Sequence, residues 1–346
     1  MRPFAYQRAA SIAQALEQLA PAAGEARHAA VLAGGTDLLP LMHTGAAAPA
    51  RLIDIKRATD MPASVVDDGA GGVYIGALVR LGDLVRDPLL RTRFPMLVHA
   101  VCDAATVQLR NIATVGGNLL QRPRCWYFRN PALHCWLHGG EHCLARDGDN
   151  REHAIFGDGP CCAVHPSDPA VALLALDATV RIAGSERERT LAIDGLYAEP
   201  SPQRRRETVL DEELILRVEL PAGAARRRSA WVKEQARKSW AFALASAAVS
   251  LDVDDGVVRD VRIALGGVAP VPWRAAAAES VLRGAPADAS RVERACDAAL
   301  DAASALSDNG YKIDLASTAL RRCMLRALPG APAGHVASAD FAHRQR

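Results

Sequence analysis

Four cysteines in the middle of the chain have the residue type and the number that a metal centre requires. They lie within residues 113–168, with nine, seven and seventeen residues between successive members: Cys125, Cys135, Cys143 and Cys161. Four thiolates suit structural zinc or an iron–sulfur cluster. The spacing is neither the paired C-x-x-C of a zinc ribbon nor the tight run of a bacterial ferredoxin, so it does not name the metal. Cysteines without any ligand are the alternative. Nearby histidines could replace a thiol in a mixed zinc site: His134, His138, His142 and His153.

Two double-glycine turns followed by polar residues could hold a phosphate. The first is Gly34-Gly35-Thr36-Asp37, after the apolar run 29–33, and the second is Gly116-Gly117-Asn118. Glycines let the backbone approach an anion, and successive N–H groups can point at it. One such turn is as easily a tight turn without a ligand, but two could hold the pyrophosphate of a dinucleotide. The GxGxxG fingerprint is absent, so a nicotinamide site of that kind is not supported.

Length and composition predict a soluble protein of two or three domains. The chain has 346 residues, of which 50% are apolar, 23% charged and 5% aromatic, and its net charge is +2. These values do not favour nucleic acid as a partner. No apolar run approaches the roughly 20 residues of a membrane span, and no signal peptide is visible, so the chain by itself is expected to be cytosolic. In a large chain without an export signal, cysteines are expected to bind a metal or to pack in a core, and not to form disulfides. Cys102, Cys296 and Cys323 are expected in the core.

The first half of the chain alternates helices and strands. A helix is expected after Ser11, and strands are expected at 29–33, 52–55 and 73–77. Two further helices are expected, near 81–85 and from 88 to 104. The periodicity then fails between 121 and 165, a length that is uncommon for a loop and usually functional. We expect thiolate–metal bonds, and not a hydrophobic core, to hold this loop.

The second half predicts a separate α+β domain. A strand near 214–220 precedes the boundary, and strands near 229–235 and 257–266 are expected within the domain, around an apolar segment at 240–253. Helices are expected near 273–283, 288–307 and 313–328. Two arginine runs, 204–206 and 226–228, are expected in solvated loops, the second at a domain boundary.

The motifs together resemble the FAD-binding medium subunits of the xanthine dehydrogenase / molybdenum hydroxylase family. The resemblance rests on 32–38, 113–119 and 166–168, and on Leu265-Gly266-Gly267-Val268-Ala269 with Pro272-Trp273-Arg274. The cysteine insertion is similar to that of the aldehyde oxidoreductase subgroup and, more distantly, of the beta subunit of 4-hydroxybenzoyl-CoA reductase. Those subunits carry a [4Fe-4S] cluster there. The subgroup places its last ligand four residues before a His, which selects Cys161 over Cys162.

The resemblance implies an α+β protein with a flavin domain of the vanillyl-alcohol-oxidase / PCMH type. That domain would have two α/β subdomains, followed by an α+β domain of the CO dehydrogenase flavoprotein C-terminal type. The expected bounds are 1–225 for the flavin domain (1–56 and 57–225, with the insertion at 121–165), 226–328 for the C-terminal domain and 329–346 for a disordered tail.

The resemblance also implies the residues that would hold FAD. Residues 30–38 and 114–118 would contact its pyrophosphate and ribitol. Asp168 would bond its polar groups, and Ile215 and Lys233 would lie near the isoalloxazine. The full set is Ala30, Val31, Leu32, Ala33, Gly34, Gly35, Thr36, Asp37, Leu38, Thr106, Thr114, Gly116, Gly117, Asn118, Asp168, Ile215 and Lys233. A cation such as Lys233 would stabilise an anionic reduced flavin; a surface position on its strand is the alternative. The cluster ligands would be Cys125, Cys135, Cys143 and Cys161.

The implied function is electron transfer within a heterotrimeric molybdenum-dependent aldehyde oxidoreductase. A large subunit with molybdenum cofactor would oxidise the aldehyde, a small subunit would carry two [2Fe-2S] clusters, and FAD in this chain would pass electrons to an external acceptor. The [4Fe-4S] cluster would mainly brace its loop. A partner with a twin-arginine signal could export the assembly to the periplasm. The alternatives are a subunit like that of 4-hydroxybenzoyl-CoA reductase and, in another class, a zinc-stabilised scaffold without flavin.

Overall fold

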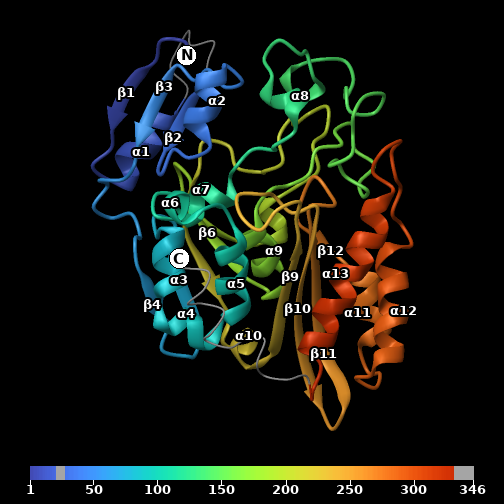
Figure 1. Cartoon of the computed structure of the whole chain (residues 1–346). Coiled ribbons are helices and arrows are strands. Elements are labelled where there is room, and N and C mark those ends of the chain that lie inside the picture. The colour runs from blue at the N-terminus through green and yellow to red at the C-terminus, as the bar shows by residue number, and fades with distance from the viewer. Residues whose placement is uncertain (21–27, 331–346) are drawn as a thin grey trace.

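The N-terminal part of the chain folds into a small parallel sheet. A computed structural model describes residues 1–20 and 28–330. The three strands follow the order β1-β3-β2 with parallel pairing, as strands connected by helices require. Helix α1 begins where the sequence predicts, because Oγ of Ser11 accepts a hydrogen bond from the N–H of Gln14. The elements, at the upper left of Figure 1, are β1 (Ala5–Arg8), α1 (Ile12–Leu19), β2 (Ala29–Leu32), α2 (Leu38–Thr44) and β3 (Arg51–Asp54).

A five-stranded antiparallel sheet follows, in the order β4-β5-β8-β6-β7. Its strands are β4 (Val65–Asp67), β5 (Val73–Gly76), β6 (Thr179–Ala183), β7 (Glu188–Ala192) and β8 (Leu214–Leu220). Its helices are α3 (Leu81–Arg86), α4 (Pro88–Arg93), α5 (Pro95–Asp103), α6 (Val107–Arg110), α7 (Val115–Leu119) and α9 (Asp168–Ala175), with a short 3-10 turn η2 (Asp194–Leu196). The single helix predicted over 88–104 was wrong. Phe94 leaves helical geometry and Pro95 starts a new helix, because its ring leaves no N–H to continue the previous one.

The C-terminal part is a four-stranded antiparallel sheet in the order β12-β11-β10-β9. The helices α5 and α9 pack on one face, α11 and α13 pack on the other, and α12 packs on those two helices (Figure 1). The elements are α10 (Ala222–Arg226), β9 (Arg228–Glu234), β10 (Ala245–Asp254), β11 (Val257–Gly266), β12 (Trp273–Arg274), α11 (Ala276–Leu282), α12 (Ala289–Leu300) and α13 (Tyr311–Ala327). The middle helix stops at Leu300, short of the predicted 307, and the segment to 310 is irregular.

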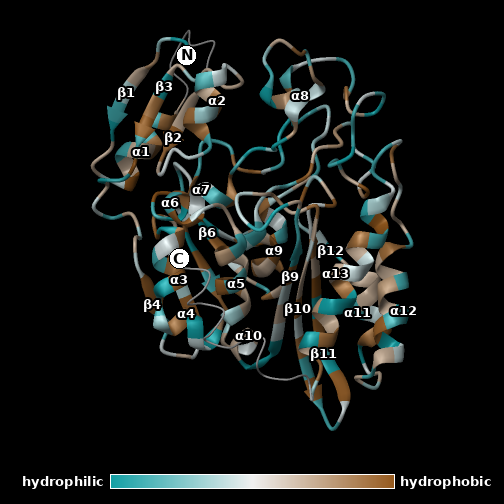
Figure 2. Cartoon of the chain, viewed as in Figure 1, coloured by the Kyte–Doolittle hydropathy of each residue, from teal (hydrophilic) through white to brown (hydrophobic). Residues whose placement is uncertain are grey.

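The cysteine insertion contains little regular structure, as predicted. Between residues 121 and 165 only α8 (Trp126–Arg129) and η1 (Trp136–His138) are helical. The expectation that no hydrophobic core holds this loop was wrong. A buried cluster of its own includes Phe128, Trp136 and Leu137 together with four cysteines. Figure 2 shows polar and apolar residues interspersed along the segment around α8. The apolar ones form this small core.

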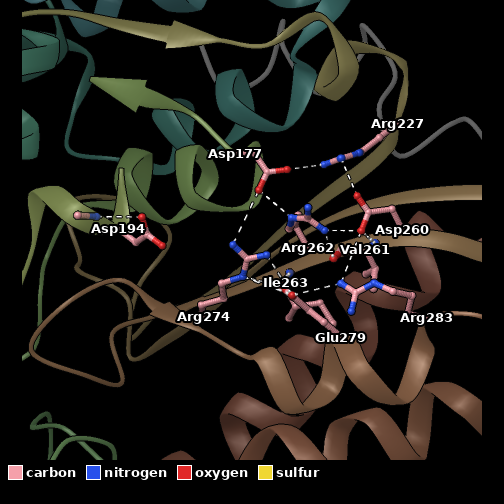
Figure 3. Close-up of polar contacts among 11 residues, drawn as sticks. Asp177, Asp194, Arg227, Asp260, Val261, Arg262, Ile263, Arg274, Glu279 and Arg283 are labelled. Carbon is pink, nitrogen blue, oxygen red and sulfur yellow. Dashed lines mark hydrogen bonds and ion pairs between the residues drawn. The ribbon is translucent and has the colours of Figure 1, made fainter. Parts of the chain in front are cut away.

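Each arginine run was predicted to be solvated, but one member of each, Arg205 and Arg227, is held by other parts of the fold. Arg227 bonds to Asp177, at the end of α9, and to Asp260 on β11, both at 2.8 Å. Arg262 bonds to the same two carboxylates, so the network joins the segment after α9 to the C-terminal sheet (Figure 3). Arg205 stacks on Trp136 and donates to the carbonyls of Trp136 and Gly140, which fastens the insertion.

Three predicted core cysteines are buried, and a membrane-spanning helix is absent from the described residues. Cys102, Cys296 and Cys323 lie in the two large apolar cores. Within residues 1–20 and 28–330, no helix is long and apolar enough to cross a bilayer. Residues 331–346 of the predicted tail lie outside the described part of the chain.

Candidate functional site

The two double-glycine turns lie against each other at the junction of the two sheets. A Cβ atom on Gly34 would lie 2.3 Å from the carbonyl oxygen of Ile112, just before the second turn. Such a distance excludes any side chain at position 34. Gly35 adopts a φ of 71°, in the left-handed region that glycine occupies without strain. Glycine is therefore required at both positions by the close approach and by the backbone conformation.

A cavity of about 210 Å³ lies between the turns. It is lined by most of the residues predicted to hold FAD: Ala30, Val31, Ala33, Gly34, Gly35, Thr36, Asp37, Leu38, Thr114, Gly116, Gly117 and Ile215. Within the described residues, the backbone N–H groups of Gly34 to Asp37 donate no hydrogen bond. Four consecutive unpaired donors beside a cavity suit the oxygens of a phosphate.

A second cavity, of about 540 Å³, opens beside the first and shares Gly34 and Thr114 with it. Leu32, another predicted site residue, lines it, and Lys56, Arg80 and Asn111 supply its polar wall. No sequence motif marks these three polar residues as part of the site. The two adjoining cavities form one cleft, in which the first cavity is mainly apolar and the second is more polar.

Polar residues at the start of α9 extend the site toward the C-terminal sheet. Oγ of Ser167 donates to Oδ1 of Asn118 at 2.6 Å and accepts from the N–H of Ala170 as the helix cap. The neighbouring Asp168 lies 2.7 Å from Nζ of Lys233. Burial raises the pKa of Asp168, and the charge of Lys233 opposes that shift. The segment therefore connects the second glycine turn to β9 through Asn118, Ser167 and Asp168.

The side chain of Lys233 is buried, so the surface alternative for it was wrong. Its side chain is 1% exposed, and its amine donates to Asp168, to the carbonyl of Asp103 and to the carbonyl of Ala241. An ammonium group has three N–H bonds, and all three are used. Its direct partner is thus Asp168, and any effect on a bound ring arises through charge. Ile215 lies apart from it, in the first cavity, and Thr106 caps α6 by accepting from the N–H of Leu109.

The insertion brings five cysteines to one place. The thiols of Cys161 and Cys162 bond to that of Cys143, and the charge of Cys143 acts on Cys125 and Cys135. The bonds from Cys161 and Cys162 lower the pKa of Cys143, and burial raises the pKa of Cys125 to about 11. None of the five forms a disulfide. Position alone does not separate Cys161 from Cys162 as a ligand, so the choice of Cys161 remains a prediction.

The histidines of the insertion do not complete a single-ion site. Nε2 of His153 lies 3.2 Å from Sγ of Cys125, while His138 packs on the ring of Phe128. In the part of the chain that the structure describes, no group of three or more His, Cys, Asp or Glu side chains is arranged to hold one metal ion. This does not favour mononuclear zinc, which needs its ligands about 2.0–2.3 Å from one atom.

A small cavity of about 40 Å³ lies between the cysteine insertion and the start of α9. Arg124, Cys125 and His153 of the insertion line it together with Ser167 and Asp168, and Phe242 closes it from the C-terminal domain. The guanidinium of Arg124 stacks on Phe242 at 4.8 Å. Burial lowers the pKa of Arg124 to about 10. Sequence reasoning missed Arg124, because nothing local distinguishes it from other arginines before a cysteine.

A cleft with paired glycine turns between the first two sheets, followed by a separate C-terminal α+β domain, is the architecture of a flavoprotein subunit. The model of the FAD binding domain in molybdopterin dehydrogenase matches residues 2–223, and that of the CO dehydrogenase flavoprotein C-terminal domain matches residues 230–327. The chain belongs to this family of FAD-binding medium subunits of molybdenum hydroxylases. Membership sets aside the alternative of a zinc scaffold without flavin.

Relatives match over nearly the full length of the chain. The aldehyde oxidoreductase FAD-binding subunit PaoB of Escherichia coli is 37% identical over 94% of this chain and 99% of its own. The carbon monoxide dehydrogenase medium chain of Hydrogenophaga pseudoflava is 28% identical over 93% and 96%. A solved carbon monoxide dehydrogenase of that organism superposes with a TM-score of 0.71 at 29% identity, over 94% of this chain and 98% of that one. The predicted α+β fold and its two domain types are thereby confirmed.

Proposed function

We propose that this chain is the FAD-binding, electron-transferring subunit of a molybdenum-dependent aldehyde oxidoreductase, and that its insertion holds a [4Fe-4S] cluster. The observation that carries the flavin site is the cavity between the two glycine turns, with four unpaired N–H groups on its wall. The family match over residues 2–223 agrees with it. When bound, FAD accepts electrons singly and releases them in pairs.

The residues of this chain have separate tasks in that proposal. Gly34, Gly35 and Thr36 offer backbone donors to the pyrophosphate, and Gly116 and Gly117 bring the second turn close without side chains. Ser167 and Asn118 fix the entry to α9. Lys233 holds the carboxylate of Asp168 in place, so that Asp168 presents its free oxygen to the polar groups of the cofactor.

The cysteine set suits a cluster better than a single ion. Five thiols face one buried region, none is oxidised to a disulfide, and no trio is arranged around one point in the described residues. Four thiolates are the ligand set of such a cluster. We propose Cys125, Cys135, Cys143 and Cys161 as those ligands.

The idea that the cluster mainly braces its loop loses its main support. That idea assumed few apolar contacts, whereas the insertion has its own buried cluster and is fastened by Arg205 and by residues of the C-terminal domain. We therefore propose that a cluster held by these cysteines would supply redox chemistry more than support for the loop.

The proposed partners are a large subunit with molybdenum cofactor and a small subunit with [2Fe-2S] clusters. The support is the relative named an aldehyde oxidoreductase FAD-binding subunit, which is 37% identical over 94% of this chain. The substrate would be oxidised on the large subunit. The compartment follows the partners, since a twin-arginine signal on one of them would export the folded assembly.

The experiment is cofactor analysis of the full-length chain purified anaerobically. We expect one FAD and four irons with four sulfides per chain, a flavin band near 450 nm and a broad shoulder near 400 nm. Cys125→Ser, Cys135→Ser, Cys143→Ser and Cys161→Ser should each lose iron and keep FAD, whereas Cys162→Ser and Cys323→Ser should keep both. Colourless protein that contains zinc would overturn the proposal. If Cys162→Ser loses iron and Cys161→Ser keeps it, the fourth ligand is Cys162 and not Cys161.

A further inference from the structure

Asp37 stands at the end of the first glycine turn, yet its side chain serves the insertion. Oδ1 accepts from Nη2 of Arg129 at 2.6 Å and lies 3.0 Å from Nη2 of Arg124. Oδ2 accepts from the backbone N–H of Arg122 at 2.8 Å. Asp37 is also the N-cap of α2, a position where Asp ordinarily bonds to its own helix, but it makes no such bond. Both oxygens are committed to the base of the insertion.

The three donors surround the first cysteine of the insertion. Arg124 adjoins Cys125, and the N–H of Arg129 donates to the carbonyl of Cys125 to close α8. Arg129 also donates to the carbonyls of Pro123 and Arg122, so the segment from 122 to 129 is one compact hydrogen-bonded turn. A shift of Asp37 therefore moves the turn that presents Cys125.

The other side of Asp37 is equally constrained. Gly34 has no room for a Cβ against Ile112, and a Cβ on Gly35 would lie 2.9 Å from Leu39. Asp37 is 14% exposed and lies three residues from Gly34. Because the turn is close-packed, a shift of Gly34 or Gly35 moves Asp37 as well.

We propose that Asp37 is a positioning residue that couples the two sites: occupation of the glycine turns by FAD orders the base of the cysteine insertion, and an ordered insertion tightens FAD binding. The proposal rests on the proposed flavin site. Coupling between two sites is reciprocal, and typical couplings change an affinity by about 5- to 150-fold.

The first test is hydrogen exchange on the full-length chain stripped of FAD and then reloaded. In the wild type, FAD should slow exchange of the Arg129 amide by about 5- to 150-fold. In Asp37→Asn, which keeps the shape but removes the charge, the slowing should fall below about twofold. Asp67→Asn, which breaks the more exposed ion pair with Arg93, is the matched control and should behave as the wild type.

The second test is the reverse direction, read as FAD affinity by fluorescence. Protein loaded with iron and sulfide should bind FAD about 5- to 150-fold tighter than the iron-free chain, and Asp37→Asn should lose that ratio. Arg129→Gln breaks the same contact from the opposite side. It serves if Asp37→Asn fails to fold, as judged by circular dichroism.

The outcomes separate the two claims. A chain that binds FAD without slowing exchange at Arg129, or Asp37→Asn that keeps the full effect, overturns the coupling and leaves the flavin site intact. A chain that binds no FAD overturns the proposed function and the coupling with it. A chain that binds FAD but no iron overturns the cluster, while the exchange test still decides the coupling.

Discussion

Nζ of Lys233 and Oδ2 of Asp168 are 2.7 Å apart and nearly sealed from water, with side-chain exposures of 1% and 6%. The pair joins β9 of the C-terminal sheet to the start of α9. Removing one partner leaves an uncompensated buried charge, whereas removing both does not.

Lys233→Met should accordingly lower the free energy of unfolding by about 3–5 kcal/mol. Lys233→Met combined with Asp168→Leu should lose less than either single variant. Urea titration followed by tryptophan fluorescence measures this. Arg86→Met, in an exposed pair with Asp83, should cost no more than about 1 kcal/mol. A double variant that loses as much as the sum of the singles would refute the pairing argument.

Gly34→Ala should abolish the close contact between the two glycine turns. The added methyl would stand 2.3 Å from the carbonyl oxygen of Ile112, so the turns must separate and the cavity must change shape. We expect FAD affinity to fall by at least about tenfold, roughly 1.4 kcal/mol. Fluorescence titration of the stripped chain measures it. Gly223→Ala, where the new methyl meets nothing within 4 Å, should bind FAD normally. Equal affinity in both variants would contradict the proposed site.

Lys312→Met should change how stability depends on pH. Lys312 is fully buried, and its amine donates to the carbonyls of Glu152, His153 and Gly267. Burial lowers its pKa to about 7 from 10.5, with the charge of Glu152 opposing the shift. Between these values the unfolded chain holds a proton that the folded chain lacks. Stability from this group therefore rises with pH from about 7 to 10.5, by at most about 1.4 kcal/mol per unit.

The variant lacks that slope, so its deficit against the wild type should be small at pH 6.5 and large at pH 9.5. Urea midpoints at three pH values measure the difference. Lys238→Met, which removes an exposed lysine, is the control and should run parallel to the wild type. Parallel curves for Lys312→Met would contradict the assignment.

Asp177→Asn should weaken the junction between the two domains in a salt-dependent way. Asp177 bonds to Arg227 and Arg262, and its φ of 53° is one that Asn also tolerates, so the backbone should persist (Figure 3). We expect a loss of about 1–2 kcal/mol at low salt and a smaller loss in 1 M NaCl, because salt screens part-exposed charges. Asp254→Asn, in an exposed pair with Arg259, should change little. A loss that is independent of salt would argue for packing instead of charge.

Local pattern predicted the elements that local forces determine. Ser11 caps α1 as expected, and the alternation along 257–266 forms β11. Pro95 shows the limit of periodicity, because apolar spacing continued through a residue that ends one helix and begins another. The glycine turns were predicted to form a site, and both line one cavity.

Contacts between distant residues could not be predicted in this way. Asp37 and Arg129 are 92 positions apart, and Lys312 and His153 are 159 apart. Arg205 and Arg227 stand in runs whose composition is that of a surface loop, yet each fastens one part of the molecule to another. Whether an arginine is solvated depends on which carboxylate or carbonyl the fold brings to it. Those partners are distant in sequence, so local pattern cannot predict them.

The anchors of the insertion have a consequence for how the protein is made. Asn309 and Lys312 hold the backbone at His153, and both are translated long after it. At about 5–20 residues per second, a ribosome needs roughly 10 to 40 seconds to travel from Cys125 to Lys312. During that interval the thiols are translated but the loop is not yet fastened. Under the proposed function, the loop that would hold the cluster is therefore fastened only after α13 has docked.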